Sequence, residues 1–334
     1  MPARVASSAA TMLTNLGPRS VFTASTGLKL PVIGLGTFLS TDESTLVKSL
    51  NAALELRYPL IDTAFLYDNE HIIGKVLKDW MDNGKLRRED IFITTKLPPQ
   101  GIRVEHVKEF LEKQLKALQL EYVDLYLIHH AVGYKYDSTI MSGSEGLDLT
   151  TDHVAVWEEM ENMVDAGLTK YIGLSNFNVR QIERIMENAR IKPSNLQIEL
   201  HIFQQSKEEQ EYCERNGILI TSYATMGSMG VPEGFFVRKI DNPLTNADVL
   251  AIAKTHNKTA AQVLLRHMIQ SGIAVIPKSS KLERLKENID IFDFQLSKLE
   301  MLRLGVLDRG EYGRRFILEG MFSHPEYPYS RKTQ

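Results

Sequence analysis

The segment LIDTAFLYDNE, residues 60–70, places a carboxylate and a phenol directly after a short apolar run. Leu60 and Ile61 are typical of a buried strand, and Asp62 follows them without a spacer. A carboxylate at the end of a buried strand is costly unless a cation or hydrogen-bond donors compensate it. Tyr67 then adds a hydroxyl that can donate or accept a proton. We therefore expect the rest of the chain to supply a partner for Asp62 close to Tyr67.

Short apolar runs rich in β-branched residues recur along the chain and predict eight strands, at 32–38, 59–64, 91–97, 122–129, 171–176, 195–200, 218–223 and 273–278. Amphipathic helical patterns lie between several of them, at 69–84, 104–118, 154–167 and 206–217. Strands that alternate with helices form a parallel sheet covered by helices, and eight such strands close into a barrel. The pattern predicts an α/β fold, a (β/α)8 TIM barrel with long loops at its C-terminal face.

Three local patterns refine this fold. The glycine turn within residues 21–31 predicts an N-terminal β-hairpin that closes the bottom of the barrel. Ser206 and Glu209 have the spacing of a capping box at a helix start. An open doubly wound sheet would need a third glycine after its first strand, but GLGTFL ends on Leu39. The barrel is therefore favoured over a dinucleotide-binding sheet.

Composition and charge exclude several classes of function. The chain has 39 Lys and Arg against 42 Asp and Glu, so no basic field favours nucleic acid. Apolar runs are too short to span a membrane. A single cysteine, Cys213, excludes an internal disulfide and suggests a reducing compartment. We expect a cytoplasmic monomer that acts on a small molecule.

Residues 1–20 are rich in Ser and Ala but contain only Arg4 and Arg19 as basic residues, so they resemble a transit peptide weakly. A disordered N-terminal extension is favoured, followed by one barrel domain over residues 21–334. The segments 131–153, 224–258 and 308–334 exceed ordinary loop lengths, which is typical of functional or disordered segments.

The predicted strands end on residues that carry chemistry. In barrels of this class the active site lies at the carboxyl ends of the strands. Each residue alone has an ordinary structural explanation: Lys96 could be solvated, and His129 could be a core histidine. Their joint occurrence at one rim favours a site, formed by Asp62, Lys96, His129, Ser175, Asn176, Gln197, Tyr223 and Lys278.

These residue types suggest proton transfer. Asp62 is expected to pair with Lys96 from the neighbouring strand, which lets both charges tolerate a partly buried rim. The Lys96 ammonium would lower the pKa of Tyr67, and His129 could orient the oxygen that receives the proton. His129 and His130 face opposite ways if the strand continues, so they are not expected to share a metal. No other spacing predicts a metal site.

With these motifs the sequence resembles the aldo-keto reductase family, of the aldehyde and aldose reductase type, from about residue 21 to 330. The segments that carry the resemblance are IDTAFLYDNE, ITTKL, DLYLIHH, GLSNF, LQIELH, ITSYATMGS and IPKSSKLERLKEN. The resemblance implies a (β/α)8 barrel that binds a nicotinamide cofactor without the glycine fingerprint. It implies that Tyr67 is the general acid and that Asp62, Lys96 and His129 complete a catalytic tetrad.

The resemblance also implies a cofactor site. Ser175, Asn176 and Gln197 would hold the carboxamide, and Tyr223 would stack on the nicotinamide ring. The other cofactor-binding positions are Thr37, Phe38 and Asp62, with Met226 and Ser228 in the pyrophosphate loop and Lys278, Ser279, Arg284, Glu287 and Asn288 at the adenosine end.

A second capping box, Ser280 to Glu283, would start a helix beside Lys278 and Arg284 and favours the extra phosphate of NADPH over NADH. The alternative is an ordinary solvated helix start.

The predicted substrate pocket departs from many relatives. Phe38, Pro98 and His130 occupy positions where tryptophan is common in the family, and Ala131 replaces a usual proline. The leading hypothesis is NADPH-dependent reduction of aldehydes or ketones, with the proton from Tyr67.

Two alternatives stay open. One is a lyase that uses Lys96 as a Schiff-base nucleophile, against which the Asp62 partner argues. The other is a non-catalytic structural or cofactor-sensing barrel.

Overall fold

The protein is a parallel barrel in a computed structural model that describes residues 16–138, 143–232 and 238–329. Neighbouring strands are parallel throughout the eight-stranded sheet, in the order β10-β9-β8-β7-β6-β5-β4-β3. The strands are β3 (Leu35–Gly36), β4 (Leu60–Asp62), β5 (Phe92–Leu97), β6 (Val123–Ile128), β7 (Thr169–Ser175), β8 (Asn195–Glu199), β9 (Leu219–Tyr223) and β10 (Ala274–Val275). All eight predicted strands are present, within a few residues of their expected bounds.

The first and last strands meet and close the sheet. A parallel bridge joins Ile33 to Val275, and the Gly34 N–H donates to the Val275 carbonyl at 2.9 Å. A Cβ atom on Gly36 would lie 2.5 Å from the Ile276 carbonyl oxygen, so only glycine permits this approach. The glycines of GLGTFL thus serve strand packing, and the predicted (β/α)8 barrel is confirmed.

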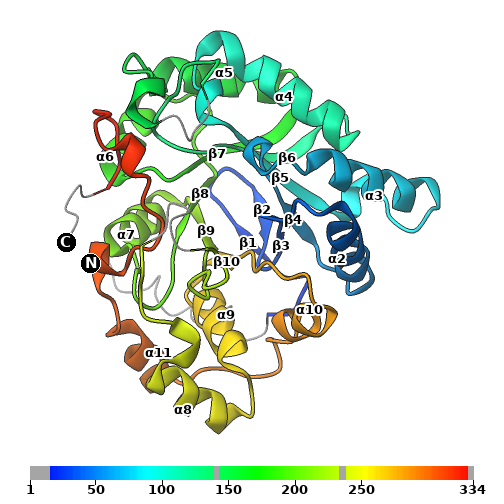
Figure 1. Cartoon of the computed structure of the whole chain (residues 1–334), viewed down its shortest axis with the longest axis vertical. Helices are drawn as coiled ribbons and strands as arrows, with labels where there is room; N and C mark the ends of the chain where they lie inside the picture. Colours follow the sequence, from blue (N-terminus) through cyan, green and yellow to red (C-terminus); the bar gives the residue numbers. More distant parts are fainter. Residues whose placement is uncertain (1–15, 139–142, 233–237, 330–334) are drawn as a thin grey trace.

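Helices surround the strands as a ring (Figure 1). They are α2 (Glu43–Glu55), α3 (Glu70–Asp82), α4 (Val104–Leu118), α5 (His153–Asp165), α6 (Val179–Asn188), α7 (Lys207–Asn216), α8 (Ala247–His256), α9 (Ala260–Gln270), α10 (Leu282–Ile289) and α11 (Lys298–Gly305). None of the helices in the described ranges is long and apolar enough to cross a membrane.

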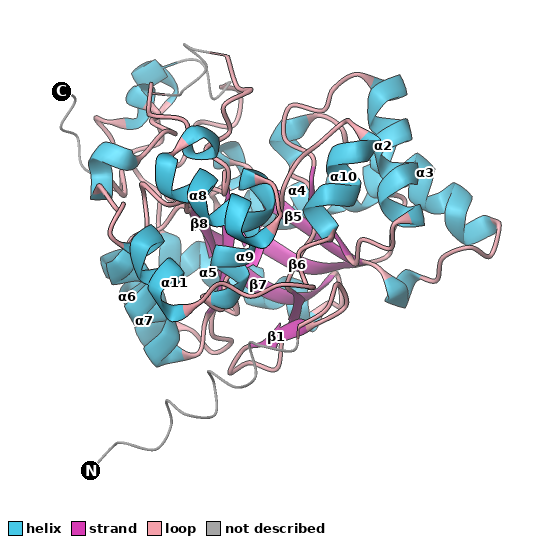
Figure 2. Cartoon of the chain, turned by 90° about the horizontal axis from the view of Figure 1, so that it is seen from below, coloured by secondary structure: helices cyan, strands magenta, loops and turns pink. Residues whose placement is uncertain are grey.

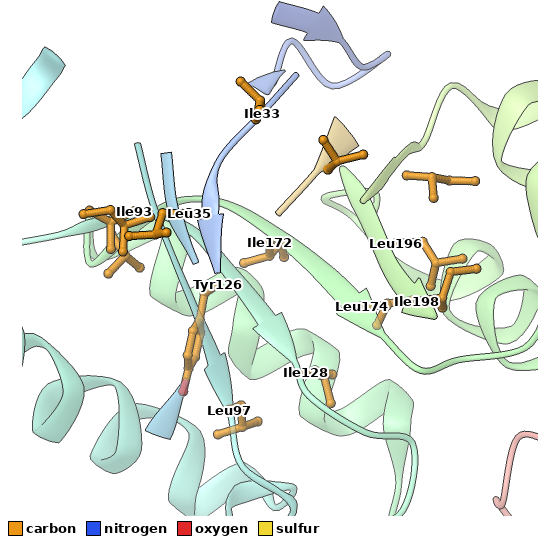
Figure 3. Packing of buried hydrophobic residues seen from close by; sticks show 14 of the residues in the cluster. Ile33, Leu35, Ile93, Leu97, Tyr126, Ile128, Ile172, Leu174, Leu196 and Ile198 are labelled. Carbon is orange, nitrogen blue, oxygen red and sulfur yellow. The ribbon is translucent and has the colours of Figure 1, made fainter. Parts of the chain in front are cut away.

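Side chains point alternately to the two faces of each strand, so the apolar residues form one layer inside the barrel and another between the strands and the helices. Leu125 and Leu127 face the barrel interior, where they pack with Leu28 and Leu30 of the N-terminal hairpin. Residues of the opposite parity face the helices, as Tyr126 and its labelled neighbours do in Figure 3. One face of each strand thus lines the barrel interior and the other packs against the helices. His129 comes two residues after Leu127 and is therefore directed toward the interior.

The hairpin closes one end of the barrel. Its strands β1 (Val21–Thr23) and β2 (Lys29–Pro31) pair antiparallel, and Figure 2 shows β1 at the lower end of the central strands. Leu28 and Leu30 are 0% and 1% exposed and fill the interior at this end. The predicted hairpin is confirmed, and the other end of the barrel is left to the polar strand ends.

Both predicted capping boxes are wrong. Ser206 has a left-handed backbone with φ of 44°, and its side chain does not cap α7. Helix α10 begins at Leu282 with Lys281 as N-cap, one residue later than predicted. Ser279 Oγ instead accepts a hydrogen bond from the Lys281 N–H at 3.1 Å. A serine three residues before a glutamate caps a helix only where its backbone is extended and the helix starts next to it.

The described structure begins within the stretch that was expected to lie outside the fold. Residues 1–15 lie outside the described ranges, but Leu16 packs against the core. The Ser20 carbonyl accepts a hydrogen bond from the Val32 N–H at 3.1 Å. Residues 16–20 therefore belong to the folded structure, and the boundary predicted at residue 21 is a few residues too late.

Candidate active site

Asp62 and Lys96 form a buried ion pair at the rim of the barrel. Lys96 Nζ lies 2.6 Å from Asp62 Oδ1, and the two side chains are 0% and 3% exposed. Lys96 Nζ also donates to the Thr63 carbonyl at 2.7 Å, and Gln197 Nε2 donates to Asp62 Oδ2 at 2.8 Å. Each charge thus has several polar partners, as a buried pair requires. The predicted pairing of Asp62 with Lys96 is confirmed.

Strand register explains this pairing. Parallel β4 and β5 place Asp62 opposite Thr94, and Lys96 follows two residues later on the same face. The lysine side chain is long enough to reach Asp62 from there. The Asp62 carbonyl accepts from Thr37 Oγ1 at 2.9 Å, which ties β3 to the same point. Three neighbouring strands therefore hold the pair.

Tyr67 lies on a short 3-10 turn, η1 (Phe65–Tyr67), that follows β4. Asn69 holds this turn: its Oδ1 accepts from Thr63 Oγ1 at 2.9 Å and its Nδ2 donates to the Thr37 carbonyl at 2.9 Å. The side chain of Asn69 is therefore used for the loop and does not cap α3. This arrangement leaves the Tyr67 hydroxyl 3.3 Å from Lys96 Nζ.

Burial and the Lys96 charge shift the pKa of Tyr67 in opposite directions. Burial raises the pKa of Tyr67 above its usual value, while the Lys96 ammonium opposes that rise and Asp62 adds to it. The expectation of a net lowered pKa is therefore wrong for the protein without a ligand, because desolvation outweighs the cation. Burial also disfavours charge on Lys96, but Asp62 and Tyr67 outweigh it and raise the pKa of Lys96. The ammonium is retained.

His129 follows β6 and lies beside Tyr67, with 5.8 Å between the ring centroids. Burial, then His130 and Lys96, lowers the pKa of His129 well below its usual value, so the imidazole is neutral. Its Nδ1 has no hydrogen-bond partner within the described ranges. A neutral imidazole offers one donor and one acceptor, which suits it to bind a carbonyl oxygen without protonating it.

His130 belongs to the loop after β6, and its ring stacks on His129 at 4.8 Å between centroids. Burial lowers the pKa of His130 to about 4, so this ring is neutral as well. The strand ends at Ile128, so it does not continue through the two histidines. Within the described ranges, His, Cys, Asp and Glu side chains form no cluster that could hold a metal ion.

Asn176 connects the predicted carboxamide site with the tetrad. It follows Ser175 at the end of β7, and its Nδ2 donates to the His129 carbonyl at 2.9 Å. Its Oδ1 accepts from the Tyr223 hydroxyl at 2.7 Å. The structure thus brings Ser175, Asn176, Gln197 and Tyr223 to the rim that carries the tetrad. Met226 and Ser228 follow in the partly buried segment 224–232, and residues 233–237 lie outside the described ranges.

The residues predicted for the adenosine end lie together after β10. Lys278 and Arg284 are exposed, and no ion pair within the described ranges involves either cation. Ser279 and Asn288 are buried, and Glu287 is partly buried on α10. Two cations beside one short helix suit an anionic group.

The C-terminal segment 308–329 contributes residues that the sequence pattern did not reveal. The Phe316 ring lies 5.6 Å from Tyr223 and 6.3 Å from Phe38, and Phe38 lies 5.3 Å from Tyr67. The buried Glu199 carboxylate positions Phe316 by accepting a hydrogen bond from the Phe316 N–H at 2.9 Å. Pro98 is buried directly after β5 at the same rim.

A second C-terminal residue touches the carboxamide site. The Tyr329 hydroxyl donates to Asn176 Oδ1 at 3.1 Å, so Asn176 accepts from two tyrosines. The ring of Tyr329 is covered by the Arg314 guanidinium, 3.5 Å from the ring centroid. No periodic pattern could have indicated either contact, because residues 308–329 have little regular secondary structure.

Comparison with known proteins shows the family to which the chain belongs. The sequence profile of the Aldo/keto reductase family matches residues 32–308. The chain belongs to the aldo/keto reductase family. It is 36% identical over 312 residues to prostaglandin F synthase 2 of Bos taurus, which covers 91% of this chain and 95% of that protein. It is 40% identical over 322 residues to aldo-keto reductase family 1 member A1 of Xenopus tropicalis, covering 91% and 96%.

A solved structure supports the same assignment. The aldose reductase from Schistosoma japonicum is 42% identical, with a TM-score of 0.85, and the match covers 94% of this chain and 100% of that one. Membership of the family confirms the predicted enzyme class, an NADP-dependent oxidoreductase that acts on carbonyl or CH–OH groups.

The buried pair predicts an asymmetric effect on stability. Asp62→Asn leaves the Lys96 charge buried without its counterion, so the free energy of unfolding should fall by about 3 to 5 kcal/mol. Adding Lys96→Met removes the unpaired charge and should recover most of that loss. Urea unfolding at pH 7 measures both. Glu43→Gln, which breaks an exposed ion pair with Lys75, should change the free energy by about 0.5 kcal/mol or less.

Proposed function

We propose that the protein reduces aldehydes or ketones to alcohols with NADPH and that Tyr67 donates the proton. The observation that carries this proposal is the Tyr67 hydroxyl 3.3 Å from Lys96 Nζ, with Asp62 bound to the same ammonium. Neutral His129 lies beside them. A hydroxyl, a fixed cation and a neutral donor at one rim are the groups that reduction of a carbonyl requires.

Each residue of the tetrad has a distinct role. The His129 N–H binds the carbonyl oxygen and orients it toward Tyr67. The Tyr67 hydroxyl gives its proton to that oxygen as the carbon is reduced, so the C=O bond becomes CH–OH. Lys96 stabilises the phenolate that remains, and Asp62 keeps Lys96 charged and in place. When bound, the nicotinamide supplies the hydride.

The residues at the rim fit a nicotinamide cofactor. Polar side chains of Ser175, Asn176 and Gln197 match the donors and acceptors of a carboxamide, and the Tyr223 ring offers a surface for an aromatic ring. Lys278 and Arg284 would bind the extra phosphate of NADPH. The rest of the proposed cofactor site consists of Thr37, Phe38, Asp62, Met226, Ser228, Ser279, Glu287 and Asn288.

The pocket residues indicate the kind of substrate. Phe38 and Phe316 form an aromatic wall beside Tyr67, and neutral His130 and Pro98 lie at the same rim. We infer a small carbonyl compound with an apolar substituent. The long segments 131–153 and 308–334 would set the choice among such compounds, since Phe316 comes from the second.

The Schiff-base alternative has no support in the site. Lys96 Nζ donates to Asp62, to the Thr63 carbonyl and to Tyr67. These contacts keep the amine protonated, whereas a Schiff-base nucleophile must be neutral. A non-catalytic role would not require this arrangement of proton donor and cation.

Tyr67→Phe is the most selective change for testing the proton donor. The substitution keeps the ring and removes only the hydroxyl, so the turnover number should fall by about 10² to 10⁴ fold. NADPH affinity should stay within a few fold, because the cofactor site is unchanged. Stopped-flow oxidation of NADPH by an aldehyde measures the first, and NADPH fluorescence the second. A variant that turns over at the wild-type rate would remove Tyr67 from the mechanism.

Arg284→Ala tests the preference for NADPH. One charge-assisted hydrogen bond contributes roughly 1.5 to 3 kcal/mol, so NADPH binding should weaken by about 10 to 100 fold. NADH binding should change little, since NADH lacks the extra phosphate. Lys286→Ala, an exposed cation on the same helix, is the control and should affect neither cofactor. Equal losses for NADPH and NADH after Arg284→Ala contradict the assignment.

A further inference from the structure

A buried carboxylate lies directly behind the proposed active site. Glu70 is the first residue of α3, three positions after Tyr67, and is 5% exposed. Its Oε1 accepts from Thr95 Oγ1 at 2.5 Å and from Gln114 Nε2 at 3.2 Å. No ion pair involves Glu70 within the described ranges. A buried carboxylate without a counterion is costly, and a neutral side chain could make the same contacts.

Gln114 extends these contacts to the strand that carries Lys96. Its Nε2 also lies 2.6 Å from Thr95 Oγ1 and 3.1 Å from the Lys96 carbonyl oxygen. Its Oε1 accepts from the Tyr126 hydroxyl at 3.0 Å, and Figure 3 shows Tyr126 among the buried residues of the sheet. Elements α3, α4, β5 and β6 thus meet in one buried hydrogen-bonded cluster.

The cluster lies on the side of β5 opposite to the tetrad. Thr95 and Lys96 are consecutive in a strand, so their side chains point to opposite faces. Lys96 faces Asp62 and Tyr67, whereas Thr95 faces the helices. The Glu70–Thr95 hydrogen bond therefore fixes the start of α3, and with it the Tyr67 turn, against the strand that carries Lys96.

We propose that Glu70 is a positioning residue that sets the contact between Tyr67 and Lys96 and places a second negative charge near Lys96. This inference rests on the proposed function. Burial raises the pKa of Glu70 to about 7, against the weaker opposing effects of Thr95, Gln114 and Lys96. In the described structure the ionisable groups that interact electrostatically with Glu70 are Lys96, whose side chain lies on the other face of β5, and Tyr126 of β6, while α4 presents neutral Gln114.

The charge on Glu70 has a defined effect on the reaction. Because the folded-state pKa is raised, Glu70 is mostly protonated below about pH 7 and ionised above it. Ionised Glu70 offsets part of the effect of Lys96 on Tyr67 and makes the phenol a weaker acid. The rate of reduction should therefore fall as pH rises through the pKa of Glu70.

The hydrogen bond between Glu70 and Thr95 is tested with Thr95→Val and Thr95→Ser. The probe is 4-nitrobenzaldehyde with NADPH, and the readout is the single-turnover rate of NADPH oxidation. Thr95→Val removes the hydroxyl at constant shape and should lower the rate about 10 fold with NADPH affinity unchanged. Thr95→Ser restores the hydroxyl and should return the rate to within a few fold of wild type. If Thr95→Ser is as slow as Thr95→Val, the hydroxyl does not position the pair and the proposal is overturned.

The charge is tested with Glu70→Gln, which keeps the shape and the acceptor oxygen. The wild-type single-turnover rate should fall about 3 fold between pH 6 and 8, and the rate of the variant should not show this fall. Glu161→Gln is the matched control, since Glu161 is also 5% exposed but lies on α5 and accepts from the Arg190 N–H. Its pH profile should equal that of the wild type.

The outcomes separate this inference from the proposed function. If the rate of Glu70→Gln still falls between pH 6 and 8 as the wild-type rate does, the role of the Glu70 charge is overturned, even when Tyr67→Phe is inactive. A wild-type protein that reduces no carbonyl overturns the proposed function and this inference together. Should Thr95→Val fail to fold, the pH profile of Glu70→Gln decides alone.

Discussion

Two opposite charges buried at the mouth of the barrel constrain the structure around them. Asp62 and Lys96 are almost fully buried, so each needs polar partners in fixed directions. Thr63, in the loop after β4, and Gln197 of β8 supply them, and Thr37 binds the Asp62 backbone carbonyl. The register of β4 with β5, the closure of the barrel and the plugged lower end all serve to present this pair at one rim.

The Lys96 charge of that pair acts together with burial on the other groups of the site. The Lys96 charge opposes protonation of His129 and the rise that burial imposes on the pKa of Tyr67. One rim thus holds a fixed cation, a neutral donor and a phenol, and the cation and the imidazole are buried. Groups arranged in this way before substrate binds need little reorganisation during the reaction, which is the main source of electrostatic catalysis.

The sequence predicted those features that depend on local pattern or on strand order. Eight apolar runs predicted the strands, and their polar ends predicted that Asp62 meets Lys96. Predictions of features that depend on backbone conformation or on long-range packing were wrong, or could not be made. Ser206 could not be known to have a left-handed backbone, and nothing periodic marks Phe316 or Tyr329. The raised pKa of Tyr67 was missed because sequence shows the neighbouring cation but not the extent of desolvation.

Lys96, held by Asp62, keeps the pKa of Tyr67 below the value that burial alone would set. In the proposed mechanism the reverse reaction, oxidation of an alcohol with NADP⁺, uses the Tyr67 phenolate as base, so its single-turnover rate should rise with pH as Tyr67 ionises. The direct measurement compares this pH profile in the wild type and in Lys96→Met. In the variant the rise should move to higher pH by about one unit or more, because the phenolate no longer has a cation beside it. A rise at the same pH, or at a lower one, would contradict this role of Lys96.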